Sequence, residues 1–349
     1  RNILALGILF GLAHSFRTVG YSLYVILPLS LGWMFFDRQN LRSLKAWRFF
    51  ARNSLLPLIP IFLLSNFLMV LLYPSLHSET FPRLWEMLIH SARLFANQTN
   101  LFLGREIPAE LSPVTYLPVW ILVTTPLALL ALASASPFLF RSTKKDPLAI
   151  VFGSAFWVNV ILYFVLRPRL MDGLRLYLFL LPVIGIGAAI GMIRLMAQNP
   201  RNLWRSVALG LVIANLAIVS FHMGRLFPYQ NLYFNELTGG LKGAYGRFDT
   251  DYWGETYKEA VEWLKQNELK DLDPSVQTVA LHTRGNAFSS VYYFKPGMLW
   301  KPFEEAEYYL SFTRWHENER AGNIKPLHVV MREGVPLNYI YRLKGASKN

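Results

Sequence analysis

Residues 227–265 read FPYQNLYFNELTGGLKGAYGRFDTDYWGETYKEAVEWLK and separate two parts of the chain with different chemistry. The stretch begins with aromatic and amide side chains, which suit a membrane–water boundary because a ring can be buried while its polar edge stays hydrated. Four glycines follow, and glycine adopts positive φ without steric cost. The stretch ends in a predicted helix over residues 255–267, whose apolar residues fall at helical spacing: Tyr257, Ala260, Val261 and Leu264.

The composition indicates a membrane protein. The chain of 349 residues is 53% hydrophobic and only 16% charged, with a mean hydropathy of +0.27. Its net charge of +13 is confined to one part: residues 1–222 hold 19 basic and 7 acidic residues, and residues 223–349 hold 16 and 15. This basicity belongs to loops between apolar segments, where the positive-inside bias explains it, so nucleic-acid binding is not expected. Without cysteine the chain forms no disulfide.

About seven transmembrane segments are predicted, the first of them partial. Runs of roughly 20 apolar residues are needed for each crossing, and the candidates are residues 3–13, 21–36, 55–73, 118–140, 149–166, 176–195 and 207–221. Basic loops at 37–53, 141–145 and 194–205 mark the cytoplasmic side. The long polar interlude at 74–117 then lies outside, with an amphipathic helix over residues 81–95 on the membrane surface.

The predicted fold is an all-α membrane domain followed by a small extracytoplasmic α/β domain. Residues 1–222 form the transmembrane domain with its outer loop at 74–117, residues 223–254 form a hinge at the membrane boundary, and residues 255–349 form the soluble domain. That domain is expected to contain strands at 276–282, 307–312, 327–332 and 338–343, a helix at 287–294 and a turn at 334–336. The chain starts in mid-helix at Arg1, so we expect further sequence upstream. The predicted location is the plasma (inner) membrane of the cell, crossed several times.

Basic side chains on the predicted outer side are candidates for binding a phosphate. Guanidinium groups bind phosphate in a bidentate manner and stay charged when partly desolvated, and the candidates for a lipid-linked donor phosphate are Arg17, His14, Arg167, Arg169 and Arg175. The alternatives are arginines that reach to lipid headgroups and, for Arg17 and His14, a satisfied polar cluster between helices.

Acidic side chains on the same side are candidates for the acceptor region. These are Glu106, Asp249 and Asp251, and none of the outward carboxylates in the membrane half forms a tight pair. Asp249-Thr-Asp251 resembles a metal-binding Asp-x-Asp motif, so a divalent metal stays open as a cofactor, but Asp251 is equally suited to cap the helix that follows. No metal site and no catalytic residue is assigned. Three tryptophans of the soluble domain, Trp253, Trp300 and Trp315, are suited either to stack on sugars or to fill a small core.

Several stretches together resemble bacterial membrane glycosyltransferases of family 39, which are relatives of the protein O-mannosyltransferases in the GT-C superfamily. The likeness is carried by Leu101-Phe-Leu-Gly-Arg-Glu, Thr115-Tyr-Leu-Pro-Val-Trp, Arg17-Thr-Val-Gly, Asp172-Gly-Leu-Arg175 and Asp251-Tyr-Trp-Gly. It is most specific over residues 99–127 and 227–264. Enzymes of this kind place their key acidic residues in a first outer loop near the N-terminus. No stretch of this chain matches that loop, so we expect the catalytic carboxylates upstream.

The resemblance implies transfer of a sugar from a polyprenyl-phosphate donor to an acceptor on the extracytoplasmic side. The acceptor would be a protein, a lipid or a cell-envelope glycan, and the membrane lipid itself is a further partner. Two alternatives without catalysis remain: a transporter of lipid-linked sugars, and a membrane-anchored protein whose soluble domain binds glycans.

Overall fold

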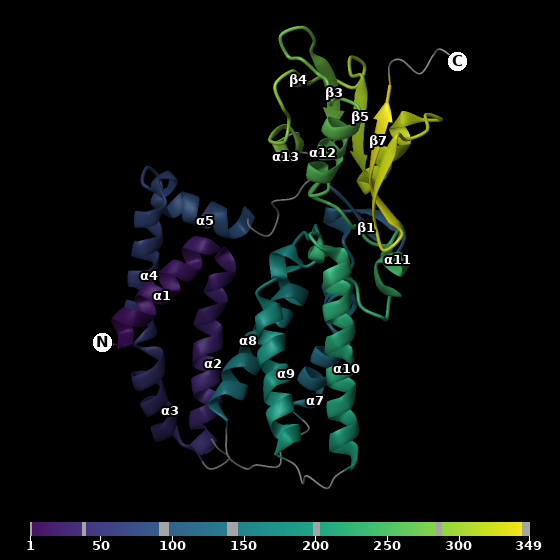
Figure 1. The fold of residues 1–349 in the computed structure, drawn as a ribbon. Helices are drawn as coiled ribbons and strands as arrows, with labels where there is room; N and C mark the ends of the chain where they lie inside the picture. Colours follow the sequence, from purple (N-terminus) through teal and green to yellow (C-terminus); the bar gives the residue numbers. More distant parts are fainter. Residues whose placement is uncertain are drawn as a thin grey trace. The chain divides into compact units, whose positions relative to one another are not determined.

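The structure, a computed structural model, describes residues 2–36, 40–90, 98–137, 146–197, 203–283 and 288–343. Parts of all three predicted cytoplasmic loops, residues 91–95 of the predicted surface helix and the C-terminal six residues lie outside these ranges. The described chain is mostly helical and forms two compact units that are discontinuous in sequence (Figure 1). The first unit comprises residues 1–96, 128–170 and 176–209, and the second comprises 97–127, 171–175 and 210–349.

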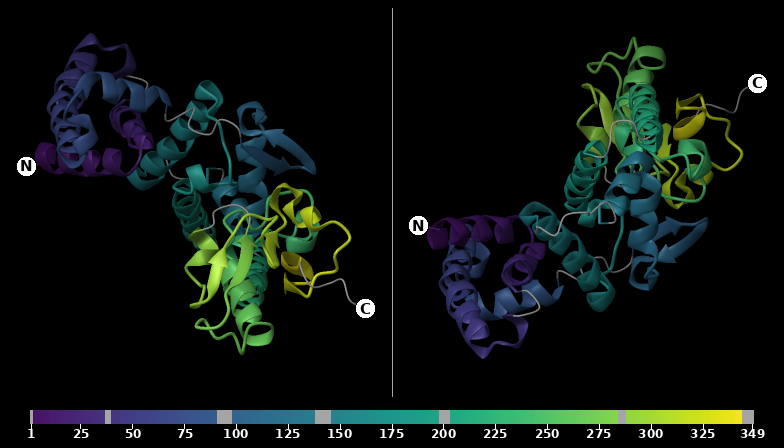
Figure 2. Two further views of the ribbon diagram at one scale, coloured as in Figure 1. Left: turned by 90° about the horizontal axis from the view of Figure 1, so that it is seen from above. Right: turned by 90° about the horizontal axis from the view of Figure 1, so that it is seen from below.

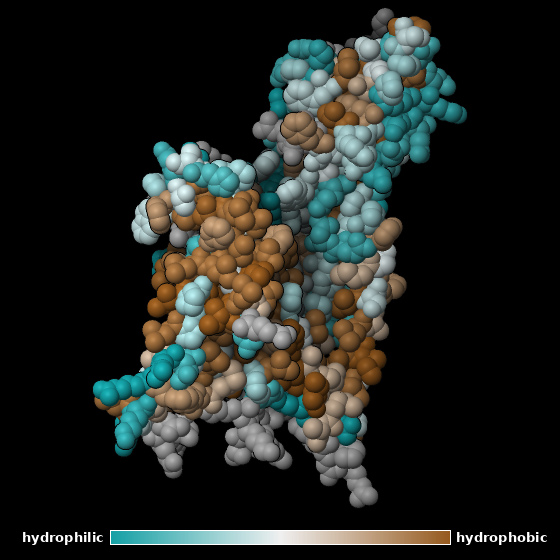
Figure 3. Space-filling view, turned by 90° about the vertical axis from the view of Figure 1, so that its left-hand side faces the viewer, coloured by the Kyte–Doolittle hydropathy of each residue, from teal (hydrophilic) through white to brown (hydrophobic). Residues whose placement is uncertain are grey.

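The first unit is built from apolar helices. Its elements are α1 (Asn2–Phe16), η1 (Thr18–Ser22), α2 (Leu23–Phe35), η2 (Asn40–Arg42), α3 (Leu44–Phe50), the π-helical η3 (Ala51–Leu55), α4 (Leu58–Leu72), η4 (Pro74–Leu76), α5 (Thr80–His90), α7 (Leu127–Ala135), α8 (Pro147–Leu166), α9 (Leu180–Met196) and the start of α10 (Leu203–Leu226). Large apolar side chains such as Leu63 and Phe67 of α4 are more than 60% exposed. Hydrophobic residues cover the face of this unit seen in Figure 3, as expected for helices surrounded by lipid.

Four helical segments of the described chain are long and apolar enough to cross a membrane, which is fewer than predicted. They are Thr18–Phe35, Leu44–Leu72, Pro147–Leu166 and Leu203–Leu226. The predicted span over residues 118–140 is instead a broken pair, α6 (Tyr116–Thr124) and α7, and counting it as one span gives five. The helices α1 and α9 have only 15 and 17 residues. Seven spans are therefore not confirmed, because a long apolar run does not reveal where proline and capping side chains interrupt it.

Helices α1 and α4 pack against each other, within the N-terminal purple part of the ribbon (Figure 1 and Figure 2), and two glycines of α1 permit the close approach. Gly7 and Gly11 form a Gly-x-x-x-Gly pair on one face of α1. A Cβ at Gly7 would lie 2.5 Å from Leu64 Cδ2, and one at Gly11 would lie 3.0 Å from the Ser65 carbonyl oxygen. Small residues at this spacing allow helix backbones to approach closely inside a membrane.

The second unit contains a five-stranded mixed sheet in the order β4-β3-β5-β7-β6. The strands are β3 (Val279–Thr283), β4 (Met298–Trp300), β5 (Tyr308–Phe312), β6 (His328–Arg332) and β7 (Val335–Arg342). Strand β3 runs parallel to both of its neighbours, β4 and β5, and the β5–β7 and β6–β7 pairs are antiparallel. The prediction of a small C-terminal domain that contains a sheet is thereby confirmed.

Helix α12 (Tyr257–Asn267) covers one face of this sheet. Its buried side chains pack against Leu281, Leu310 and Ile340 of three neighbouring strands. The other elements of the second unit are β1 (Thr99–Phe102), β2 (Arg105–Pro108), η5 (Ala109–Leu111), η6 (Arg175–Tyr177, which spans the border with the first unit), η7 (Gln230–Leu232), α11 (Gly240–Ala244), α13 (Phe288–Val291) and η8 (Arg314–Ala321).

Three details of the strands differ from the prediction. The hairpin β1–β2 lies in the interlude predicted as an outer loop, and it turns at Leu103-Gly104, both with positive φ, a combination typical of tight hairpins. Strand β4 was not predicted because it is three residues long. The last strand starts at Val335, so the turn is Glu333-Gly334. Pro336, which was predicted in the turn, lies inside β7 beside a register shift of β6. A missing N–H is tolerated at such an irregularity.

Candidate functional site

The hinge, residues 223–254, is fixed to α6 by one amide side chain. Asn235 Nδ2 donates hydrogen bonds to the carbonyl oxygens of Leu122 (2.6 Å) and Thr125 (2.8 Å). The backbone N–H of Asn235 donates to the carbonyl oxygen of Val123 (2.8 Å). Carbonyl groups at the end of a helix lack partners within it, so Asn235 satisfies the groups that the break after α6 leaves free.

Further along the hinge, the buried carboxylate of Asp249 contacts the β1–β2 hairpin. Phe248 packs among the rings of Phe102, Trp120 and Phe234, which fixes the next residue. Asp249 Oδ2 accepts a hydrogen bond from the Leu101 N–H at 3.0 Å. Its side chain is buried, and a buried carboxylate requires partners to be stable.

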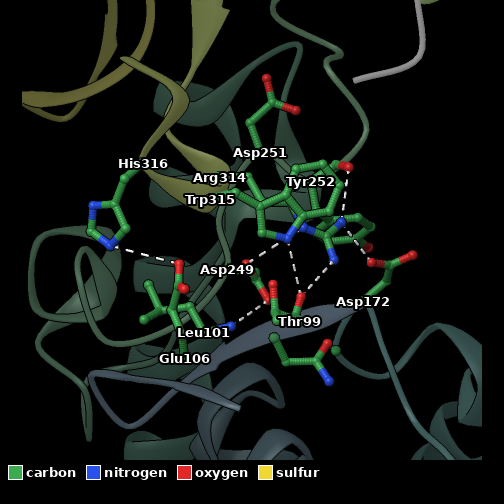
Figure 4. A network of polar contacts seen from close by, with 12 residues as sticks. Thr99, Leu101, Glu106, Asp172, Asp249, Asp251, Tyr252, Arg314, Trp315 and His316 are labelled. Atoms are coloured by element: carbon green, nitrogen blue, oxygen red, sulfur yellow. Dashed lines mark hydrogen bonds and ion pairs between the residues drawn. The ribbon is translucent and has the colours of Figure 1, made fainter. Parts of the chain in front are cut away.

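Asp249 and a second buried carboxylate, Asp172, share one principal partner. This partner is Arg314, the residue at the start of η8 just after β5. Its guanidinium Nη1 lies 2.8 Å from Asp172 Oδ1, and its Nε lies 3.7 Å from Asp249 Oδ1. The same Nη1 donates to the Tyr252 carbonyl oxygen at 3.1 Å. Figure 4 shows Arg314 between the two aspartates. The arginine and both carboxylates are buried, so each charge depends on the others for its stability.

A second arginine completes the chain of ion pairs. Arg175 Nη1 lies 3.0 Å from Asp172 Oδ2, so each carboxylate oxygen of Asp172 faces one guanidinium. The Arg175 guanidinium also lies 4.2 Å from the centre of the Trp253 ring, within the range of a cation–π contact. Asp172 itself has a φ of +58°, and the N–H of the next residue, Gly173, donates to the Tyr116 hydroxyl at 3.2 Å.

An aromatic pocket of about 630 Å³ adjoins this network. It lies where the parallel strands β3, β4 and β5 end, because His282 and Thr283, Trp300, and Phe312 occupy those ends. The carboxyl ends of parallel strands are a common location for ligands in α/β sheets. The full lining is Gln98, Met171, Asp172, Tyr252, Trp253, His282, Thr283, Trp300, Phe312, Arg314 and Trp315.

Two of the three indole N–H groups in the pocket are held by backbone carbonyls. Trp315 Nε1 donates to Thr99 O at 3.2 Å, and Trp300 Nε1 donates to Thr283 O at 3.4 Å. These bonds fix both ring planes, and Trp300 is 41% exposed. The three tryptophans singled out in the sequence therefore line one cavity, although Trp315 also contacts the core of the sheet.

A smaller cavity of about 220 Å³ is lined by Glu106 and Asp249 and shares Arg314 and Trp315 with the aromatic pocket. Glu106 Oε1 lies 3.7 Å from His316 Nε2 (Figure 4). The structure thus brings two of the predicted acceptor-side residues together. Glu106 lies on β2.

Asp251, the third predicted residue of this group, serves as a structural cap. Its Oδ1 accepts from the N–H groups of Gly254 (2.8 Å) and Glu255 (3.1 Å), and its Oδ2 accepts from the N–H and hydroxyl of Thr256. Asp249 and Asp251 have separate partners, and the described residues contain no group of three or more His, Asp or Glu side chains suited to a metal ion.

The remaining candidates for the donor phosphate lie in the first unit. His14 is buried in α1 and stacks on Tyr21 at 4.1 Å between ring centres. Arg17 Nη1 donates to the Leu176 carbonyl oxygen at 3.0 Å. Arg167 ends α8 in the left-handed conformation with an exposed side chain, and Arg169 is half-buried. Arg175, which was predicted in the same set, belongs to the second unit and is already paired with Asp172.

Four residues that line these two cavities were not predicted from the sequence as site residues: Arg314, Tyr252, His282 and His316. The available signal was the Thr-Arg-Trp-His stretch that follows the predicted strand at 307–312, because polar residues at the carboxyl end of a strand often face a site.

Comparison of the chain with protein-family models, with curated proteins and with solved structures finds no match.

Burial raises the pKa of the Asp249 carboxyl to about 6, and the nearby Arg314 guanidinium and the Leu101 N–H offset only part of this effect. An unfolded aspartate titrates near 3.8, so between about pH 4 and pH 6 the folded state binds the proton more tightly than the unfolded state. This group therefore makes the protein less stable as the pH rises through that window.

We expect Asp249→Asn to remove this pH dependence, because an asparagine oxygen still accepts from the Leu101 N–H but does not titrate. Thermal unfolding of the full chain in nanodiscs, followed by tryptophan fluorescence from about pH 4 to pH 7, measures it. The difference in midpoint between variant and wild type should move in favour of the variant as the pH rises. Parallel curves for the two proteins would contradict the assignment.

Proposed function

We propose that this chain is an integral-membrane glycosyltransferase, or the C-terminal part of one, and that the aromatic pocket of its second unit binds a sugar. The observation that carries the proposal is the pocket itself: Tyr252, Trp253, Trp300 and Trp315 line one cavity beside paired ionic groups. Ligand pockets of this kind combine apolar and aromatic walls with a few placed polar groups. The apolar helices of the first unit support a substrate that is anchored in the membrane.

In this proposal the acceptor hydroxyl attacks the anomeric carbon of the donor sugar. The new C–O bond forms as the bond to the lipid phosphate breaks, a carboxylate takes the hydroxyl proton, and the phosphate leaves with its negative charge. Electrostatic stabilisation of that charge is the role proposed for Arg17, Arg167 and Arg169. The proton acceptor is proposed to lie in sequence upstream. Within the second unit, Glu106 is the solvent-accessible carboxylate of the cluster, with 44% of its side chain exposed.

A second function, glycan binding without catalysis, is favoured by a specific observation. The carboxylates of Asp172, Asp249 and Asp251 all accept hydrogen bonds or face arginines. All three carboxylates are buried and already occupied by donors of the protein, so none of them is placed to contact an acceptor hydroxyl. The same pocket would then bind a glycan of the cell envelope and the helices would anchor it.

Sugar binding and sugar transfer should be measured separately. In nanodiscs, the fluorescence of the full chain titrated with methyl glycosides should show saturable binding, and Trp300→Ala should weaken it about tenfold because a stacking surface is lost. Trp85→Ala is the matched control, since Trp85 lies on α5 and is 67% exposed. Equal binding by the two variants would rule out the pocket as the sugar site.

Transfer from a polyprenyl-phosphate sugar should be assayed with membranes that contain this chain and with membranes that contain a form extended to its native start. Transfer by the extended form supports the enzyme. Binding of glycosides without transfer by either form supports the glycan-binding alternative.

A further inference from the structure

A second cavity of the second unit lies at the last turn of α10 and shares no residue with the aromatic pocket. It has a volume of about 340 Å³, and we call it the basic pocket. Its lining comes from α10, the hinge, α11 and the β6–β7 turn: His222, Arg225, Phe234, Glu236, Gly239, Gly240, Lys242 and Glu333. Gly239 and Gly240 form one part of the wall, which therefore carries no side chains, and both have the positive φ that favours glycine.

The charges of the basic pocket are unequally satisfied. His222 Nδ1 lies 2.7 Å from Glu333 Oε1, and Arg225 Nε lies 4.0 Å from the same oxygen. The Arg225 side chain is 55% exposed. Lys242 is exposed and forms no ion pair among the residues that the structure describes. Glu333 is therefore engaged mainly with His222 at 2.7 Å, whereas Arg225 and Lys242 retain the capacity to bind an anion.

The basic pocket lies at the end of an apolar helix, and this position indicates which kind of anion it binds. Helix α10 has 24 residues and is apolar enough to span a membrane, and the headgroup layer of a bilayer lies where such a helix ends. A phosphate in that layer carries negative charge at the depth of Arg225. Guanidinium binds phosphate oxygens in pairs, and a lysine ammonium adds a point charge.

We propose that the basic pocket binds the phosphate of a membrane-lipid headgroup. Arg225 and Lys242 contact the phosphate, and Glu333 orients His222 beside them. Glu236 lies on the same wall, is exposed and accepts a hydrogen bond from Asn215 Nδ2 at 3.3 Å. Its negative charge weakens phosphate binding, so the pocket holds the lipid reversibly.

The test uses the purified full chain in nanodiscs of neutral lipid, with the soluble probe dihexanoyl-phosphatidylglycerol. Dihexanoylglycerol, which lacks the phosphate, and inorganic phosphate are the comparison probes. We expect the double variant Arg225→Gln/Lys242→Gln to bind the phospholipid at least about tenfold more weakly, since two charge-assisted contacts are lost. Arg247→Gln is the matched control, because Arg247 is an exposed hinge arginine that does not line this pocket.

A variant that is expected to bind the phospholipid more tightly tests the same site, because a gain of affinity does not result from misfolding. Glu236→Gln removes a like charge from the wall, and we expect it to bind the phospholipid several-fold more tightly than wild type. The proposal is overturned if Glu236→Gln and the double variant both bind as wild type does, or if dihexanoylglycerol binds as well as the phospholipid. Inorganic phosphate that binds as tightly as the phospholipid would instead identify a soluble anion and overturn the lipid source. Glycoside binding at the aromatic pocket should be unchanged in every variant, so this test is independent of the proposed function.

Discussion

Arg314→Ala is expected to destabilise the second unit by about 3–5 kcal/mol, because it leaves buried carboxylates without their principal counter-charge. Arg314 faces Asp172 at 2.8 Å and Asp249 at 3.7 Å, and at most a few per cent of each of the three side chains is exposed. Arg175 remains beside Asp172 in the variant, but the hydrogen-bond donor left to Asp249 among the described residues is the Leu101 N–H. The midpoint of thermal unfolding, followed by tryptophan fluorescence of the full chain in nanodiscs, measures the loss.

Arg320→Ala is the matched control for this experiment. Arg320 belongs to the same segment, η8, and pairs with Glu304 at 3.2 Å, but 35% of its side chain and 73% of that of Glu304 are exposed. An exposed pair of this kind contributes at most about 1 kcal/mol. If Arg314→Ala and Arg320→Ala unfolded at the same temperature, the buried network would not hold the second unit together. Glycoside binding should also weaken in Arg314→Ala alone, since Arg314 lines the aromatic pocket.

Asp251→Ala is expected to cost about 2–4 kcal/mol, because four donors at the entry to α12 lose their common acceptor. The donors are the N–H groups of Gly254, Glu255 and Thr256 and the Thr256 hydroxyl. Thr256 is fully buried and also accepts from Asn338 Nδ2 of β7 at 3.1 Å, so water cannot replace the carboxylate. Asp251→Asn keeps one acceptor oxygen and should fall between the wild type and the alanine variant.

The control for this variant is Asp273→Ala. Asp273 accepts from Ser275 in the loop before β3 in a similar local pattern, but it is fully exposed, so its loss should leave the midpoint close to that of wild type. Adding Mg²⁺ or Mn²⁺ separates the cap from a metal site. A wild-type midpoint that rises with the ion while the Asp251→Ala midpoint does not would support the metal motif over the cap.

Elements with a strong local pattern were predicted closely. Helix α12 was expected over residues 255–267 and covers Tyr257–Asn267, and β5 and β6 begin one residue after the predicted positions. Each has apolar residues at the period of its own structure and turn residues at its ends, so a window of about ten residues contains the information. The predicted amphipathic helix at 81–95 is likewise present as α5, from Thr80 to His90.

Elements that depend on distant partners were predicted less well. The β1–β2 hairpin is held by the hinge, since the Gly104 N–H donates to the Arg247 carbonyl oxygen at 3.0 Å. The segment over residues 118–140 is mostly apolar, yet it breaks at Thr125-Pro126, where Asn235 supplies hydrogen bonds from more than a hundred residues away. Hydropathy measures only the transfer of side chains into lipid, so it does not detect this break.

The sequence by itself determined that the chain has apolar helices long enough for a membrane, a hinge rich in aromatic and glycine residues, and a domain with strands after it. It also drew attention to Asp249, Arg175 and the three tryptophans, because their residue types are unusual at those positions. Only the tertiary structure decided what these residues do. Asp172 and Arg314 are 142 residues apart, and they meet because the fold places the loop after α8 beside the residues that follow β5. Periodicity and composition report on the local structure of about ten neighbouring residues. The partners of a buried charge are distant in sequence and are set by the tertiary structure, and pairing is necessary there because the dielectric constant is low.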